Sequence, residues 1–184
     1  MSARRVHGEG LVDRARPLSF GFDGRRFRGF AGDTVASALL ASGERVVGRS
    51  FKYHRPRGFW GAWVEDPNGL ADITLRGQRI ANCQMTSTTL EAGMEAEAAN
   101  AWPSARRDVA GLLDLAHPFF AAGFYYKTFM WPDWHLFEPV IRRLAGLGRA
   151  GGAPEDYRAD QLHDRCDVLV VGAGAAGLAA ARAA

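Results

Sequence analysis

A glycine-rich turn near the end of the sequence constrains the fold most strongly. Residues 172–177 read Gly-Ala-Gly-Ala-Ala-Gly, directly after residues 167–171, which are apolar after the first residue, Asp167, and directly before an alanine-rich stretch. A β-branched apolar run is typical of a buried strand, and alanine favours helix. Gly172 permits a tight turn, Gly174 lets the backbone approach a pyrophosphate, and Gly177 lets the helix pack closely on the strand. The pattern predicts the first strand and helix of a Rossmann α/β domain that binds a dinucleotide.

The turn by itself leaves the choice between NAD and FAD open. That choice normally depends on an acidic residue about 20 positions further on, and the sequence ends at Ala184. Residues 166–184 supply one strand and one helix, too little for a Rossmann domain, so we expect this chain alone to bind nucleotide poorly. A glycine-rich turn before an ordinary helix is the alternative interpretation.

Residues 18–43 predict two strands followed by a helix. Apolar side chains alternate over residues 18–22, and Asp23 followed by glycine is a hairpin turn signal. Thr34 can cap a helix that ends near Gly43. The apolar face of that helix carries Val35, Ala36, Leu39 and Leu40.

A second pair of strands is predicted at residues 70–75 and 78–83, on either side of an Arg-Gly turn. Two strands, a helix and two further strands fit a β-grasp domain, the fold of plant-type ferredoxins. We therefore predict an α+β protein whose residues 1–100 form a ferredoxin-like β-grasp domain.

A ferredoxin of this type holds a two-iron cluster through C-x4-C-x2-C and a fourth cysteine. In the loop after residue 58 that spacing falls on Trp60, Glu65 and Asn68, none of which is a thiolate. Cys83 alone lies near the expected fourth position, and one cysteine cannot hold a cluster. The domain is therefore predicted to lack an iron–sulfur cluster, with Cys83 a small buried apolar residue.

Residues 101–147 are predicted to be a helical extension packed on the β-grasp core. Apolar residues recur at helical spacing from residue 104 until Pro118 ends the run, and Pro139 is expected to begin a second helix. The glycine- and charge-rich residues 148–165 are predicted to be a linker, followed by the truncated dinucleotide-binding segment, residues 166–184.

Two loops carry unusual side chains. In residues 45–57 arginines, a lysine and His54 alternate with aromatics, and we expect the aromatics to pack inward while the cations pair with acidic neighbours or a partner subunit. Residues 123–134 form the densest aromatic stretch, suited equally to a core or an interface. No spacing in either loop requires a catalytic residue, so none is assigned.

Charge and cysteine content exclude several classes of protein. A net charge of +3 is too small to indicate nucleic-acid binding without a concentrated basic face. Two cysteines and five scattered histidines indicate neither a disulfide framework nor a metal site. With no uninterrupted apolar run of membrane-spanning length and no signal-peptide core at the N-terminus, we expect a cytoplasmic protein that does not enter a membrane.

Three stretches together resemble the alpha subunit of heterotetrameric sarcosine oxidases: residues 50–58 (Ser-Phe-Lys-Tyr-His-Arg-Pro-Arg-Gly), residues 123–130 (Gly-Phe-Tyr-Tyr-Lys-Thr-Phe-Met) and residues 166–177. The resemblance covers roughly residues 8–184 and includes their order. It implies a ferredoxin-like domain without a cluster, and an alpha subunit that binds NAD at Gly172, Gly174 and Gly177.

The resemblance also implies an oxidoreductase that acts on the CH–NH group of a secondary amine. Sarcosine would be demethylated to glycine, with electrons passing from FAD to FMN and then to oxygen, hydrogen peroxide released, and tetrahydrofolate accepting the one-carbon unit. The implied partners are beta, gamma and delta subunits. No nucleic acid is implied.

Family alpha subunits are several times longer than this sequence, so we expect an N-terminal part that is inactive alone. Related amine or opine dehydrogenases and hydrogen cyanide synthases share parts of this layout and remain alternatives. A non-catalytic β-grasp binding module is the alternative outside the enzymes.

Overall fold

The computed structural model describes Arg5 and residues 10–119, 129–148 and 162–184. The chain divides into two units, Met1–Ala153 and Pro154–Ala184, which we describe separately. The predicted linker falls largely on residues 149–161 and most of the aromatic loop on residues 120–128. Both therefore lie largely outside the described residues.

The first unit begins with the predicted hairpin, formed by strands β1 (Asp13–Phe22) and β2 (Arg25–Ala31). Asp23 and Gly24 both have positive φ, 49° and 71°, as the tight turn between twisted antiparallel strands requires. Phe20 pairs with Phe27 across the strands. Both rings are buried, so the alternating pattern correctly identified the inward face.

Helix α1 (Val35–Ala41) follows, as predicted. Thr34 caps it by accepting from Ser37 N, while the Ser37 hydroxyl accepts from Thr34 N, which satisfies two otherwise free amides. Val35 and Leu39 are fully buried. Leu40, which the pattern placed on the same face, is 48% exposed because the buried stripe of this short helix is narrower than expected.

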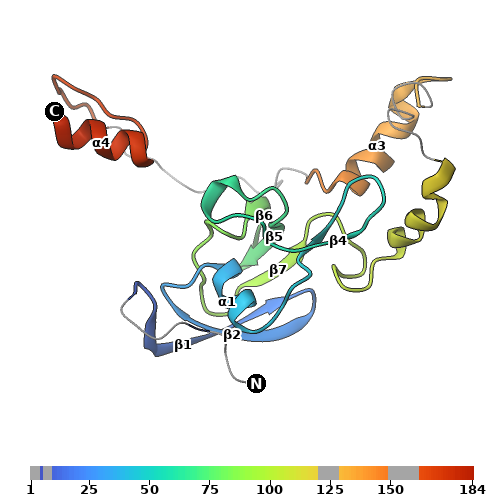
Figure 1. The fold of residues 1–184 in the computed structure, drawn as a ribbon, viewed down its shortest axis with the longest axis horizontal. Coiled ribbons are helices and arrows are strands. Elements are labelled where there is room, and N and C mark those ends of the chain that lie inside the picture. The colour runs from blue at the N-terminus through green and yellow to red at the C-terminus, as the bar shows by residue number, and fades with distance from the viewer. Residues whose placement is uncertain (1–4, 6–9, 120–128, 149–161) are drawn as a thin grey trace. The chain divides into compact units, whose positions relative to one another are not determined.

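The sheet is completed by β5 (Leu70–Leu75), β6 (Gln78–Gln84) and β7 (Glu95–Ala98), in the order β2-β1-β7-β5-β6. The β1–β7 pairing is parallel, and the other pairings are antiparallel. The pair β5 and β6 was predicted, and β7 was missed because its four residues include two glutamates. A mixed sheet with helices confirms the α+β class (Figure 1).

The core lies between α1 and the sheet. Its buried apolar members are Phe20, Phe22, Phe27, Val35, Ala36, Ala38, Leu39, Val47, Ala71, Ile73, Met85, Leu90, Met94, Ala96, Ala98 and Ala105. Cys83 packs against this cluster at its edge and is only partly buried, which corrects the expectation of a buried thiol.

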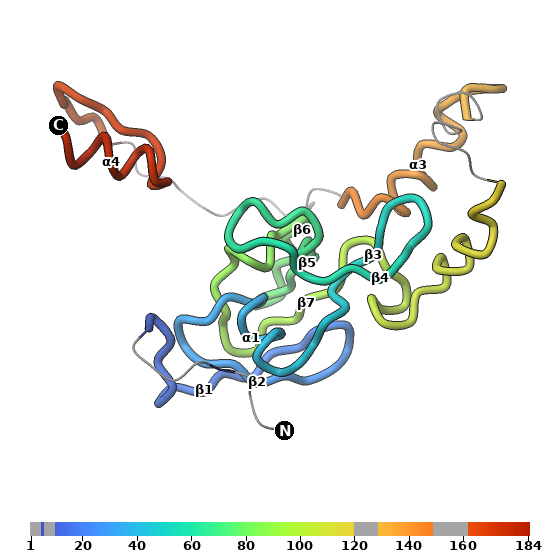
Figure 2. The backbone as a smooth tube through the Cα atoms, in the orientation of Figure 1, coloured from blue at the N-terminus to red at the C-terminus, as the bar shows by residue number. Residues whose placement is uncertain are grey.

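A two-stranded ribbon, β3 (Gly48–Arg49) and β4 (Pro56–Arg57), carries the loop of residues 50–55. Figure 2 shows this loop projecting from the ribbon before the chain continues to the short 3₁₀ turn η1 (Trp63–Glu65).

The helical extension differs from the prediction. Residues 109–119 form the 3₁₀ helix η2 (Val109–Phe119), which includes Pro118 instead of ending before it. Helix α3 (Trp134–Ala145) begins at its cap Asp133, so Pro139 lies inside the helix. Neither element has a buried residue, and neither contributes a member to the buried core cluster, in contrast to the expected packing on the core.

The second unit contains helix α4 (Ala175–Ala183). Residues 167–171 do not form the predicted strand, because a strand requires a neighbour to accept its backbone hydrogen bonds and the described residues provide none. Val171 is accordingly 88% exposed. Among the described residues of both units, no helix is long and apolar enough to cross a membrane.

Candidate functional site

The glycine turn of the second unit has the backbone geometry for which its glycines were singled out. Gly172 has φ +101°, a conformation that residues with a side chain rarely adopt. A Cβ placed on Gly177 would lie 2.1 Å from the carbonyl oxygen of Gly172. The turn and the helix therefore approach each other too closely for alanine at position 177.

Gly174 is the N-cap of α4, and a Cβ added there would meet no atom of the chain within 4 Å. The first helical hydrogen bond runs from Leu178 N to Gly174 O. The amides of residues 175–177 consequently have no acceptor within the helix, and the helix dipole adds partial positive charge at the same end. This end of α4 is suited to a phosphate group.

A second candidate feature is the loop of residues 59–69, which surrounds the carboxylate of Asp66. One carboxylate oxygen accepts from Trp60 N at 2.6 Å and Gly61 N at 2.9 Å. The other accepts from Asn68 N at 2.9 Å and Gly69 N at 2.7 Å. Burial raises the pKa of Asp66, but the four amide donors outweigh it and hold the pKa below its ordinary value.

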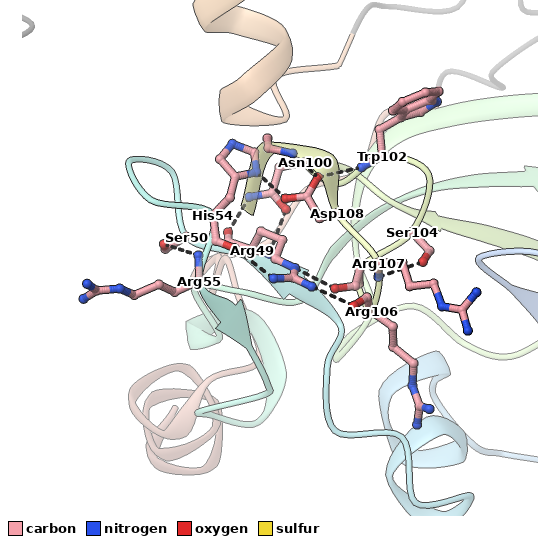
Figure 3. Close-up of polar contacts among 12 residues, drawn as sticks. Arg49, Ser50, His54, Arg55, Asn100, Trp102, Ser104, Arg106, Arg107 and Asp108 are labelled. Carbon is pink, nitrogen blue, oxygen red and sulfur yellow. Dashed lines mark hydrogen bonds and ion pairs between the residues drawn. The ribbon is translucent and has the colours of Figure 1, made fainter. Parts of the chain in front are cut away.

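The third feature joins the ribbon loop to the segment after β7 through Arg49. Its guanidinium donates to three backbone carbonyls: Nε to Ala105 O at 2.6 Å, Nη1 to His54 O at 3.0 Å and Nη2 to Arg106 O at 2.9 Å. Asn100 bonds both the amide and the carbonyl of Arg49. The loop is therefore fixed from both sides (Figure 3).

His54 is the residue that this arrangement buries. Its ring is 2% exposed, and its Nδ1 lies 2.7 Å from Oδ2 of Asp108, which is also buried. Asp108 Oδ1 accepts from the amides of Trp102 and Ala110. Asp108 thus acts as an acceptor throughout, which assigns the proton to Nδ1 of His54.

The loop therefore differs from the expected arrangement. Phe51 is 45% exposed, so this aromatic does not pack inward, and the buried side chain is His54. Arg55 does pair with an acidic neighbour, Asp114, at 2.8 Å. Sequence reasoning named His54 among the cations of the loop but missed its pairing with Asp108, because 54 positions separate the two residues and neither belongs to a recognisable spacing.

Comparison with known proteins gives the family context. Residues 15–101 match the model of the 2Fe-2S iron–sulfur cluster binding domain. The sarcosine oxidase subunit alpha of Rhizobium meliloti (strain 1021) is 53% identical over 186 aligned residues, 98% of this chain. The chain is a homologue of sarcosine oxidase alpha subunits. The expected resemblance is confirmed.

Two further alpha subunits of this name, from Corynebacterium strains P-1 and U-96, are 34% and 32% identical over 93% and 99% of the chain. The chain spans 19% of the length of the Rhizobium subunit and 13% and 14% of the Corynebacterium subunits. A solved structure, L-proline dehydrogenase from P. horikoshii, matches 47% of this chain and 16% of its own chain. The two chains are 22% identical over that match, with a TM-score of 0.35.

The side chains present do not fit the cluster named in the matched domain. Cys83 is the only cysteine within residues 15–101. Trp60 and Asn68, which stand where the C-x4-C-x2-C spacing expects cysteines, offer no thiolate. Burial raises the pKa of the Cys83 thiol, which disfavours the thiolate that iron requires. Among the described residues no group of three or more potential ligands gathers around one point. Instead, the amides of the loop converge on Asp66.

Proposed function

We propose that this chain is part of an alpha subunit of a flavin-dependent oxidoreductase that oxidises a secondary amine. The observation that carries the proposal is the 53% identity to a sarcosine oxidase alpha subunit along 98% of the chain. At that identity the two chains share a fold and its packing throughout the matched length. The proposed donor is sarcosine, with oxygen as acceptor.

The proposed enzyme converts sarcosine to glycine and releases hydrogen peroxide, with tetrahydrofolate receiving the one-carbon unit. FAD and FMN supply the redox chemistry of the complete assembly, and beta, gamma and delta subunits are its proposed partners. No described residue of this chain is assigned to either flavin.

For the first unit we propose a β-grasp domain without a cluster. The sheet order β2-β1-β7-β5-β6 with one helix on its face supports this assignment. Asp66 then organises, through four amides, the loop that a cluster organises in a ferredoxin.

For the second unit we propose that residues 166–184 contribute to an NAD site of a Rossmann domain. The amides at the start of α4 and the open side of Gly174 would hold the pyrophosphate, and Gly172 and Gly177 maintain the turn. NAD, when bound, supplies a hydride-accepting nicotinamide. The part that this chain can perform is binding and orientation of the phosphates.

The test places this chain in the assembled enzyme. Its 184 residues replace the matching segment of the Rhizobium meliloti alpha subunit, which is then produced with its partner subunits. Sarcosine-dependent peroxide release and the NAD content per alpha subunit are measured. A chimera that assembles but releases no peroxide with sarcosine would disprove the proposed activity.

Gly174→Val in the same chimera tests the turn separately. A Cβ at this position meets no atom of the chain within 4 Å, and valine would occupy the side where a pyrophosphate approaches, so the NAD content should fall at least about tenfold. Gly10→Val is the matched control, because a Cβ at Gly10 also meets nothing within 4 Å and lies far from the turn in sequence. Equal NAD content in both variants would refute the role of Gly174.

A further inference from the structure

The first unit contains a cavity of about 940 Å³ that the proposed function does not use. Its walls come from the end of β7, the segment 99–103, the start of η2 and helix α3. Trp102, Val109, Val140 and Leu144 provide an apolar part of the lining. The cavity has the size of small-molecule sites, which combine apolar walls with a few polar groups.

His54 lines this cavity and brings to it a buried nitrogen without a partner. Nδ1 is bound to Asp108, and in Figure 3 the other ring nitrogen points away from that carboxylate. Nε2 has no hydrogen-bond partner within the described part of the chain. A buried polar group in this state costs roughly 1–3 kcal/mol, so a ligand that satisfies it gains that free energy.

Asp108 determines what this nitrogen can do. When Nδ1 carries the single proton of the ring, Nε2 presents a lone pair, which accepts a hydrogen bond. The ring cannot turn over without breaking the 2.7 Å contact with Asp108. A ligand that donates an N–H or O–H therefore matches this site.

The charge of the lining selects among such donors. Four carboxylates (Asp23, Asp72, Glu97 and Asp108) and two guanidiniums (Arg79 and Arg143) line the cavity, and the formal charges of these six side chains sum to −2. Arg79 pairs with Asp72 at 2.8 Å and with Glu97 at 3.6 Å, and the sum of the charges around the cavity stays negative. Such a lining attracts cations and repels anions.

We propose that the cavity is a binding site for a small alkylammonium ligand whose N–H donates to Nε2 of His54. The negative lining provides the charge complement, and the apolar wall covers the alkyl groups. Asp108 is a positioning residue that occupies Nδ1 and so leaves Nε2 for the ligand. The site lies in the first unit and does not depend on the glycine turn of the second.

The experiment titrates the full chain with three probe ions and follows the ring ¹⁵N and ¹³C signals of its histidines by NMR. Dimethylammonium has the charge and the donor, tetramethylammonium has the charge without a donor, and acetate has the opposite charge. Dimethylammonium should shift the Nε2 signal of His54 saturably. Tetramethylammonium should bind about tenfold more weakly, the loss of one hydrogen bond.

His117 is the internal control, because its ring is exposed and its Nδ1 lies 2.9 Å from the backbone carbonyl oxygen of Asp114 in the same helix. It should not shift saturably with any probe. A saturable shift of His54 with acetate, equal binding of the two ammonium ions, or no saturation with dimethylammonium would each overturn the proposal.

A pair of variants gives a second readout at the Trp102 indole N–H. In the wild type the Trp102 indole signal should shift saturably with dimethylammonium. His54→Gln should abolish this shift, and His117→Gln should leave it unchanged. A response retained in folded His54→Gln would overturn the role of Nε2. If His54→Gln does not fold, the wild-type comparison of the three probes decides the question.

Discussion

Replacing Asp66 by asparagine removes the negative charge around which the loop of residues 59–69 is built. In the native protein each carboxylate oxygen accepts two amide N–H groups, at 2.6 and 2.9 Å and at 2.7 and 2.9 Å. An asparagine side chain offers one oxygen, so two amides lose their acceptor and face an NH₂ group. At about 1.5 kcal/mol for each lost charge-assisted bond, Asp66→Asn should lower the free energy of unfolding by about 3 kcal/mol.

The pH dependence follows from the pKa of Asp66, which lies below the ordinary value of 3.8. A carboxyl group whose folded pKa is lowered contributes stability that is present above its unfolded pKa and is lost as the pH falls through its folded pKa. The difference in unfolding free energy between the wild type and Asp66→Asn should therefore be constant near neutral pH. It should narrow below about pH 4.

The assay is urea denaturation of both proteins at a series of pH values, with unfolding free energies obtained by linear extrapolation. Asp114→Asn is the matched control. Its carboxylate is 41% exposed and pairs with one arginine, so it should cost less than about 1 kcal/mol. Two results would refute the reasoning. One is an equal loss of unfolding free energy in Asp66→Asn and Asp114→Asn, and the other is a difference between wild type and Asp66→Asn that does not narrow in acid.

Two further predictions concern buried residues of the first unit. Leu39→Ala should lower the free energy of unfolding by about 3 kcal/mol, because Leu39 is fully buried. Leu40→Ala, at a position that is 48% exposed, should lower it by less than about 1 kcal/mol. Similar losses for the two variants in thermal denaturation would mean that the buried face of α1 is misassigned. Glu44→Gln should lower the free energy of unfolding by about 2 kcal/mol, because its carboxylate is 1% exposed and binds Arg25 and Arg106. Glu91 is half exposed beside Arg76, so Glu91→Gln should leave the free energy of unfolding in urea nearly unchanged.

The sequence predicted the elements that short-range patterns specify. The β1–β2 hairpin depends on Asp23 and Gly24, α1 on the cap at Thr34, and the β5–β6 pair on its Arg-Gly turn; each of these signals acts within a few residues. The same reasoning missed β7, whose pairing with β1 joins residues more than 70 positions apart. Apolar periodicity indicated a helix near residue 109, but it could not distinguish η2 from an α-helix.

The candidate sites divide in the same way. The backbone requirements of Gly172 and Gly177 follow from a local motif, and the structure has the positive φ and the close approach that the motif implies. The pairing of His54 with Asp108 required the ribbon, the sheet and the segment after β7 to be assembled first. Asp66 was not predicted for a different reason: the cysteine spacing of a two-iron cluster falls on Glu65 and Asn68, on either side of Asp66.

The three carbonyl contacts of Arg49 have a kinetic consequence for folding. Two of them join residue 49 to residues 105 and 106, across more than 50 positions of the chain. The entropy of closing so long a loop must be overcome before these contacts contribute any stability. These two bonds therefore stabilise the ribbon loop only once residues 105 and 106 have been brought next to it. For the same reason, the loop and the segment 100–108 should open together as one cooperative unit in native-state hydrogen exchange.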